Sequence, residues 1–208
     1  ILFGKEINLD FFPKKNNHKF WDKFVKIGSS HYVIPALFFK LKERDFLKLL
    51  NLELVSYLEE IYNQNYKRNI ELVKEVNEIS HLLKSNNINH VFLKGAALVS
   101  SIYKESIGVR MVSDIDILIA KDKIYDAKNL LESNGYIDIE KNFNHIPSSK
   151  KHLDRIISNN KLFAMELHFK INDREIKYED FLDSKKMINY NFIPKTSNLL
   201  FHSIINFQ

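Results

Sequence analysis

The chain of 208 residues contains no cysteine, only five glycines and only four prolines. The lack of cysteine excludes disulfide frameworks, thiolate metal sites and cysteine nucleophiles. The few glycines form neither a Walker A loop nor a Rossmann G-x-G-x-x-G fingerprint, and a G-x-S-x-G nucleophile motif is missing too. Because no apolar run reaches the roughly 20 residues that span a bilayer, we expect a cytoplasmic protein without a membrane partner.

Hydrophobic residues make up 45% of the chain and aromatic residues 12%, enough for the core of one large domain or two small ones. The formal net charge is +5, and the sequence pI is near 9.1. A mildly basic chain suits phosphate or nucleic-acid ligands, and a solvated lysine-rich surface explains the charge equally well. Since the basic residues are spread along the chain, charge alone assigns no ligand.

The first part of the chain has the apolar spacing of helices. Helices are expected over 17–27, 31–42, 46–50 and 53–85, the last without an interrupting glycine or proline. The pair Asn86-Asn87 is typical of a helix end. We therefore expect a helical N-terminal region over residues 1–87.

From Ile88 onward, short apolar runs alternate with helical segments. Strands are expected at 91–93, 115–119, 136–139, 152–157 and 162–171, and helices at 96–103 and 123–133, the latter capped by Asp122. This pattern predicts an α+β core over 88–175 and a C-terminal helical segment over 176–208, ending in a helix at 198–207. We expect a trimmed chain, because it begins at Ile1 rather than Met and stops at Gln208 inside that last helix.

Two acids, Asp114 and Asp116, lie at the start of the expected strand at 115–119, the first of them just before it. Residues two apart on a strand point to the same face, so their carboxylates can share one or two divalent cations. Oxygen ligands of this kind favour Mg²⁺ or Mn²⁺ over zinc. The alternative is a pair of solvated acids at the start of an edge strand.

The pair Lys94-Gly95 follows an expected strand and opens a helix. A glycine at this position lets backbone N–H groups approach a phosphate at the helix N-terminus. Arg110 and Ser113 precede the acidic pair and can hold phosphate oxygens. The alternatives are an ordinary strand-to-helix turn, a structural pair between Lys94 and Asp114, and plain loop residues at 110 and 113.

Glu166 lies on the polar face of the alternating strand 162–171, together with His168 and Lys170. A third carboxylate from a neighbouring strand would complete a metal site, with His168 and Lys170 as accessory residues. The alternative is the exposed face of an antiparallel sheet, where polar residues alternate as a rule. Zinc is not expected at His145, His152 and His168, because their spacings match no common ligand pattern.

Together these motifs resemble a known family. The matching residues, in order, are Leu93 to Leu98, Tyr103, Arg110, Ser113 to Leu118, Gly135-Tyr136 and Glu166 to Phe169, with Arg68-Asn69 before them. They are similar to the bacterial uncharacterised nucleotidyltransferase family, within the DNA polymerase β-like nucleotidyltransferase superfamily. The resemblance implies a polymerase β-like core, a mixed small sheet with flanking helices, behind an N-terminal helical region.

The resemblance also implies a site and a reaction. Gly95 takes the phosphate-turn role, with Lys94, Arg110 and Ser113 as further nucleotide or phosphate ligands. Asp114, Asp116 and Glu166 become catalytic ligands of two Mg²⁺ or Mn²⁺ ions. The implied chemistry is transfer of an NMP from a nucleoside triphosphate such as ATP to a hydroxyl acceptor, with release of pyrophosphate.

The acceptor is left open among a small molecule, a protein and RNA. Two other functions also remain open. One is a catalytically silent protein of the same fold that binds a nucleotide or a partner, and the other is an RNA-binding module.

Overall fold

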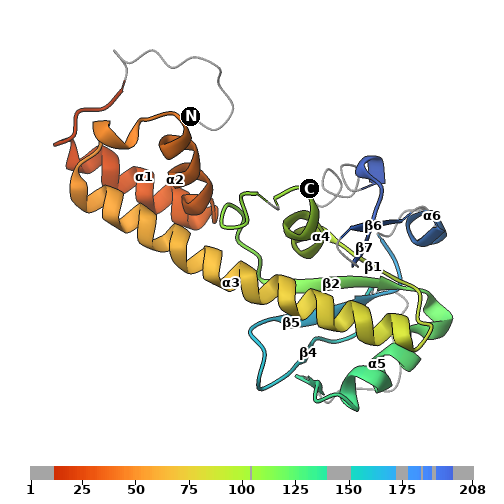
Figure 1. Ribbon diagram of the computed structural model, residues 1–208. Coiled ribbons are helices and arrows are strands. Elements are labelled where there is room, and N and C mark those ends of the chain that lie inside the picture. The colour runs from red at the N-terminus through yellow and green to blue at the C-terminus, as the bar shows by residue number, and fades with distance from the viewer. Residues whose placement is uncertain are drawn as a thin grey trace. The chain divides into compact units, whose positions relative to one another are not determined.

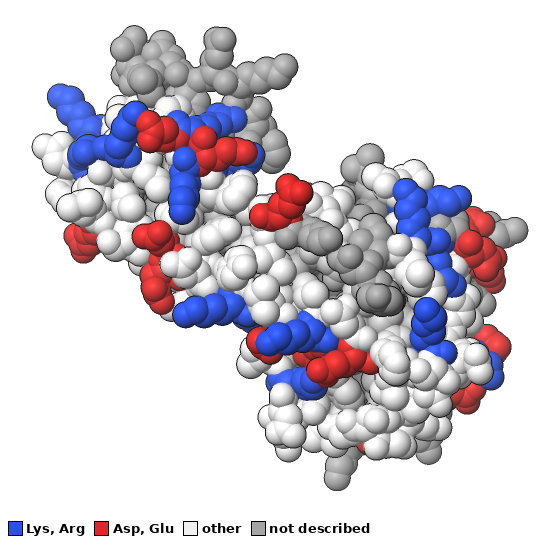
Figure 2. All heavy atoms as spheres, viewed as in Figure 1, with Lys and Arg blue, Asp and Glu red and all other residues white. Residues whose placement is uncertain are grey.

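The computed structural model describes residues 12–103, 105–139, 151–171, 178–183, 185–188 and 191–198 (Figure 1). The chain forms two compact units, one from residues 1–70 with 105–111 and the other from 71–104 with 112–208. Within the described residues no helix is both long and apolar enough to cross a membrane. On the face in Figure 2, basic and acidic side chains lie interspersed, as on a solvated charged surface.

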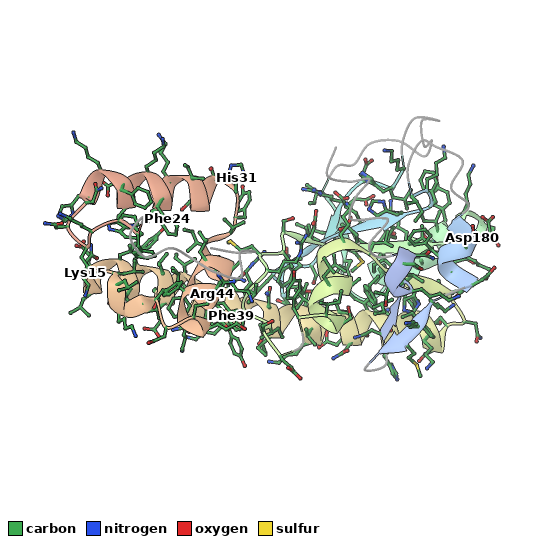
Figure 3. The ribbon with its side chains drawn as sticks, turned by 90° about the horizontal axis from the view of Figure 1, so that it is seen from above. Lys15, Phe24, His31, Phe39, Arg44 and Asp180 are labelled. Atoms are coloured by element: carbon green, nitrogen blue, oxygen red, sulfur yellow. The ribbon has the colours of Figure 1, made fainter. Side chains whose placement is uncertain are left out.

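The first unit consists of helices. These are α1 (His18–Ser30), α2 (Ile34–Glu43), the 3₁₀ helix η2 (Leu47–Leu49) and the first half of α3 (Leu52–Ser85). Their apolar faces meet in one core, to which Trp21, Ile34, Leu37, Phe38, Leu41, Leu50, Leu54 and Leu58 contribute buried side chains. Figure 3 shows Phe24 pointing from α1 toward the other helices of this unit. The expectation of a helical region at this end of the chain is confirmed.

The second unit is built on a mixed sheet of five strands in the order β1-β2-β5-β4-β3. The strands are β1 (His90–Phe92), β2 (Asp114–Ile119), β3 (Ile137–Asp138), β4 (Ile156–Ile157) and β5 (Ala164–His168). The central pair, β2 and β5, is parallel, and the other pairs are antiparallel. The α+β class with a small mixed sheet is therefore confirmed.

Helices cover both faces of this sheet. The second half of α3 lies along the face that carries His90, where the Ser80 hydroxyl is 3.1 Å from His90 Nε2 (Figure 1). On the opposite face, α6 (Tyr178–Asp183) packs Phe181 and Leu182 against Leu118 of β2. Helix α4 (Lys94–Ser101) directly follows β1 and leads toward β2. Both central strands are thus buried, which holds their side chains in fixed positions.

Some local expectations were wrong. Helix α5 (Ile124–Glu132) follows a 3₁₀ helix, η3 (Lys121–Lys123), so Asp122 lies inside η3 and does not cap α5. The C-terminal segment, expected to be helical, holds a hairpin of β6 (Lys186–Ile188) and β7 (Asn191–Ile193) after α6. Of the helix expected over 198–207, only Asn198 lies within the described residues. The expected helix end at Asn86-Asn87 matches a positive φ angle at Asn87.

Candidate active site

The register of the two parallel strands brings the predicted acids together. Asp116 of β2 lies directly opposite Glu166 of β5, and Leu118 lies opposite His168. Because alternate residues of a strand share a face, Asp114 and Asp116 are on the same side of the sheet as Glu166 and His168. The intervening isoleucines of β2 fill the other face and are fully buried, namely Ile115, Ile117 and Ile119.

Three members of this group are buried despite being polar. Asp116 is 1% exposed, and Glu166 and His168 are each 6% exposed. The alternative that Glu166 and His168 lie on the open face of an antiparallel sheet is therefore wrong. Burying ionised groups costs several kcal/mol unless each is paired, so their partners decide the chemistry of the site.

Asp116 has two nitrogen partners on one oxygen and, among the described residues, none on the other. Lys94 Nζ donates to Asp116 Oδ1 at 2.5 Å, and His168 Nε2 lies 2.8 Å from the same oxygen. Asp116 Oδ2 is buried and has no hydrogen-bond partner among the described residues. Burial alone would raise the pKa of Asp116, but the hydrogen bond and charge of His168 and the charge of Lys94 lower it overall. A buried carboxylate oxygen is thus left free to bind a cation.

Glu166 and His168 stabilise each other's charged forms. His168 Nε2 is 3.5 Å from Glu166 Oε2. The pKa of Glu166 is held far below its ordinary value, first by His168 and then, against the effect of burial, by Arg155. Burial would lower the pKa of His168, but its hydrogen bonds to Asp116 and Glu166 raise it. Glu166 is therefore an ionised carboxylate at neutral pH.

Arg155 is the site residue that the sequence did not indicate. Its Nε donates to Glu166 Oε1 at 2.6 Å, and an NH2 group donates to Asp114 Oδ2 at 3.1 Å. It immediately precedes β4, which pairs Ile156 with Met165, so its side chain lies beside Glu166. The strands expected at 152–157 and 162–171 were the signal for this proximity, but only the register of β4 against β5 places Arg155 beside Glu166.

The strand-to-helix turn at Lys94-Gly95 is tightly constrained. Lys94 has φ of 45°, a left-handed value that is unusual outside glycine. A Cβ on Gly95 would lie 2.8 Å from Val112 Cγ1, so glycine allows the close approach of the segment that leads into β2. The alternative pairing of Lys94 with Asp114 is wrong, because the Lys94 ammonium contacts Asp116 instead.

The left-handed backbone at Lys94 gives a stability prediction. Lys94→Gly is expected to be more stable than Lys94→Ala by roughly 0.5–1 kcal/mol. Glycine avoids the steric cost of a Cβ in the left-handed region, and this gain exceeds the entropy that glycine loses on folding. Both variants lose the pair with Asp116, so their difference isolates the backbone effect. Urea denaturation of the two variants measures it, and an alanine variant as stable as the glycine variant would show that this turn carries no strain.

The remaining predicted residues fall into two groups. Ser113 is near the acids, since its hydroxyl donates to Asp114 Oδ1 at 2.8 Å. Lys170 follows β5, and its backbone N–H donates to the Lys151 carbonyl at 3.2 Å. Arg110 belongs to the helical unit, where its carbonyl accepts hydrogen bonds from Asn65 and Asn69 of α3. Among the described residues, the structure thus groups Lys94 and Ser113 with the acids.

The residues of the site fit a divalent cation. Asp116, Glu166 and His168 each offer one ligand atom, and these atoms all lie within 4.8 Å of one another. The buried, unpartnered Asp116 Oδ2 adds a lone pair that a cation would satisfy. Carboxylate oxygens suit Mg²⁺ and Mn²⁺, and an imidazole nitrogen suits the transition metals. His168, expected only as an accessory residue, is therefore itself a candidate ligand.

The fold and the site define a class: an α+β domain with an acid pair on one central strand and a third acid on its parallel neighbour. The sequence profile of the family described as "Uncharacterised nucleotidyltransferase" matches residues 17–196. The chain therefore belongs to this family, and a general role in nucleotidyl transfer is supported. Neither a curated protein nor a solved structure matches the chain.

Proposed function

We propose that this protein is a metal-dependent nucleotidyltransferase that moves an NMP from a nucleoside triphosphate, with ATP as the first candidate, to a hydroxyl acceptor. The observation that carries the proposal is the juxtaposition of Asp116 and Glu166 across the parallel strands β2 and β5, with Asp114 on the same face. Family membership supports the general reaction. The metal is inferred from the side chains, and the nucleotide and the catalytic roles follow from the sequence resemblance. The domain boundaries at 87 and 175 and the cytoplasmic location stay predictions.

In the proposed reaction the acceptor oxygen forms a bond to the α-phosphorus, and the bond from that phosphorus to the β-phosphate oxygen breaks. The acceptor hydroxyl loses its proton, and pyrophosphate leaves with the bonding electron pair. Mg²⁺ or Mn²⁺, held by Asp116 and Glu166 with Asp114 or His168, would supply Lewis-acid stabilisation of the oxygens around the reacting phosphorus. Such stabilisation acts on negative charge that develops in the transition state.

The chain's own residues have separate tasks in this proposal. Glu166, an ionised carboxylate, orients the acceptor's hydroxyl, whose proton passes to water, because a pKa held far below its ordinary value makes Glu166 a weak base. Lys94, placed by the turn after β1 within reach of Asp116, offsets charge on the leaving pyrophosphate. The N-terminus of α4 at Gly95 and the Ser113 hydroxyl are proposed phosphate donors. Arg110 is proposed as a further phosphate ligand from the sequence resemblance.

The test is an incorporation assay with each of the four labelled NTPs, Mg²⁺ or Mn²⁺, and a cell extract as the source of acceptors. We expect metal-dependent labelling of a protein, an RNA or a metabolite, and loss of the label with Asp114→Asn plus Asp116→Asn. Label that persists in this double variant would contradict the site. Metal-independent nucleotide binding without transfer to any acceptor would support a catalytically silent protein of the same fold. Salt-sensitive RNA binding that survives Asp114→Ala would support an RNA-binding module.

A further inference from the structure

Arg155 holds the two acids at the edge of the site with a single guanidinium. Its Nε is 2.6 Å from Glu166 Oε1 on β5, and an NH2 group is 3.1 Å from Asp114 Oδ2 on β2. A guanidinium is always charged and planar, and its fork of donors suits two carboxylate oxygens at once. A permanent positive charge therefore lies between the same two oxygens that a cation bridging Asp114 and Glu166 would require.

The candidate cation position at Asp116, Glu166 and His168 differs from the position that Arg155 holds. Asp116, Glu166 and His168 offer ligand atoms that lie within 4.8 Å of one another, and Asp116 Oδ2 is buried without a hydrogen-bond partner among the described residues. Arg155 uses Glu166 Oε1, whereas His168 lies near Glu166 Oε2. The two oxygens of Glu166 thus face two separate positions. Arg155 holds the one at Oε1, and the proposed ion would bind at Oε2, which lies beside His168 and 3.9 Å from His152 Nε2.

The balance of charge points the same way. An ion at the His168 imidazole displaces its proton, and with His168 neutral the three carboxylates outweigh Lys94 and Arg155 by one negative charge. One divalent ion turns this into a single positive charge, which suits a nucleoside triphosphate. A second ion would leave three positive charges close together while Arg155 stays in place, and like charges in a partly buried site repel strongly.

We propose that the Arg155 guanidinium takes the place of a second cation between Asp114 and Glu166. The free protein then binds one divalent ion, at Asp116, Glu166 and His168, and a second ion binds only when Arg155 leaves. Departure is feasible because the Arg155 side chain is 54% exposed, whereas that of Glu166 is 8% exposed and stays in the sheet. This inference rests on the proposed function only in treating the acids as metal ligands, and it differs from the two resident ions that the family resemblance implies.

The experiment is a titration of the EDTA-treated full chain with Mn²⁺ alone, followed by electron paramagnetic resonance of free Mn²⁺ and by calorimetry. The variants are Arg155→Gln, which removes the charge, and Arg155→Lys, which keeps the charge without the fork. Lys121→Gln is the matched control, because it removes one exposed positive charge beyond the other end of β2. Thermal melts establish whether each variant is folded. If Arg155→Gln does not fold, Arg155→Lys still allows a comparison with the wild type.

We expect one Mn²⁺ per chain for the wild type and for Lys121→Gln. Arg155→Gln is expected to bind Mn²⁺ about tenfold more tightly and to take a second ion. A tenfold change in affinity is the size expected when one unit charge a few Å from the ion is removed in a solvated site. Arg155→Lys is expected to lie between the two. Weaker or unchanged binding by Arg155→Gln, or two ions in the wild type, would overturn the inference and leave the metal site standing. If neither wild type nor variant binds Mn²⁺, the metal site of the proposed function fails as well.

Discussion

Asp116→Asn is expected to lower the rate of nucleotidyl transfer by about a thousandfold. The substitution keeps the shape of the side chain but removes the charge of the most buried acid and replaces one of its oxygens by a donor. A metal ion contributes several kcal/mol of transition-state stabilisation, and about 4 kcal/mol corresponds to a thousandfold in rate. The measurement is the initial rate with saturating NTP and metal, once an acceptor has been found.

The matched control is Asp126→Asn, which makes the same chemical change on the exposed surface of α5. It is expected to keep the wild-type rate, because an exposed ion pair with Lys123 contributes little. Circular dichroism should show that Asp116→Asn is folded. A folded Asp116→Asn variant with more than about a tenth of the wild-type rate would show that this carboxylate does not hold the catalytic ion.

Acidification from pH 6.5 to pH 4 is expected to destabilise the second unit by about 3 kcal/mol through His90 alone. His90 is fully buried, its Nδ1 is 2.9 Å from the Ile88 carbonyl, and the Ser80 hydroxyl is 3.1 Å from its Nε2. This arrangement suits a neutral imidazole that donates from Nδ1 and accepts at Nε2. Burial lowers the pKa of His90 from 6.5 to about 4.

The sign follows from proton binding. Between pH 6.5 and pH 4 the unfolded chain binds a proton on His90 and the folded chain does not, so acid favours unfolding in this range. Below pH 4 both states are protonated, and the contribution of His90 is lost completely.

Urea denaturation at pH 7, 5.5 and 4 measures this effect as a difference between wild type and His90→Gln. Other groups titrate in both proteins and cancel in that difference, which should shrink by about 3 kcal/mol from pH 7 to pH 4. The exposed control His31→Gln is expected to follow the wild type at every pH. A constant difference between wild type and His90→Gln across the series would show that His90 is not buried as a neutral ring.

Much of the fold could be predicted from local patterns. The 34 residues of α3 carry a helical apolar stripe without glycine or proline, and the isoleucines that alternate with acids in β2 predict a strand with one apolar face. Asp114, Asp116 and Glu166 were predicted from their strands together with the motifs that resemble the family, because polar residues alone alternate on many strands with one buried face. Local patterns and these motifs contain the information needed for these features.

Other features depend on contacts between distant segments. Arg155 joins the site only because β4 pairs with β5 at Ile156 and Met165, and a one-residue shift would turn its side chain to the other face. An alternating strand does not show whether its polar face is buried. The parallel pairing of β5 with β2 is what buries His168. The hairpin of β6 and β7 was missed because strands of three residues show too little period to be recognised.

The position of the transferred label shows which phosphate group the protein moves. Parallel reactions with α-³²P and γ-³²P NTP, metal and the acceptor distinguish nucleotidyl transfer from phosphoryl transfer. The proposed site predicts that label from the α-position enters the acceptor, that label from the γ-position leaves as pyrophosphate, and that Asp116→Asn loses both signals. Transfer of the γ-label to the acceptor, or α-label transfer that persists in Asp116→Asn, would contradict the account.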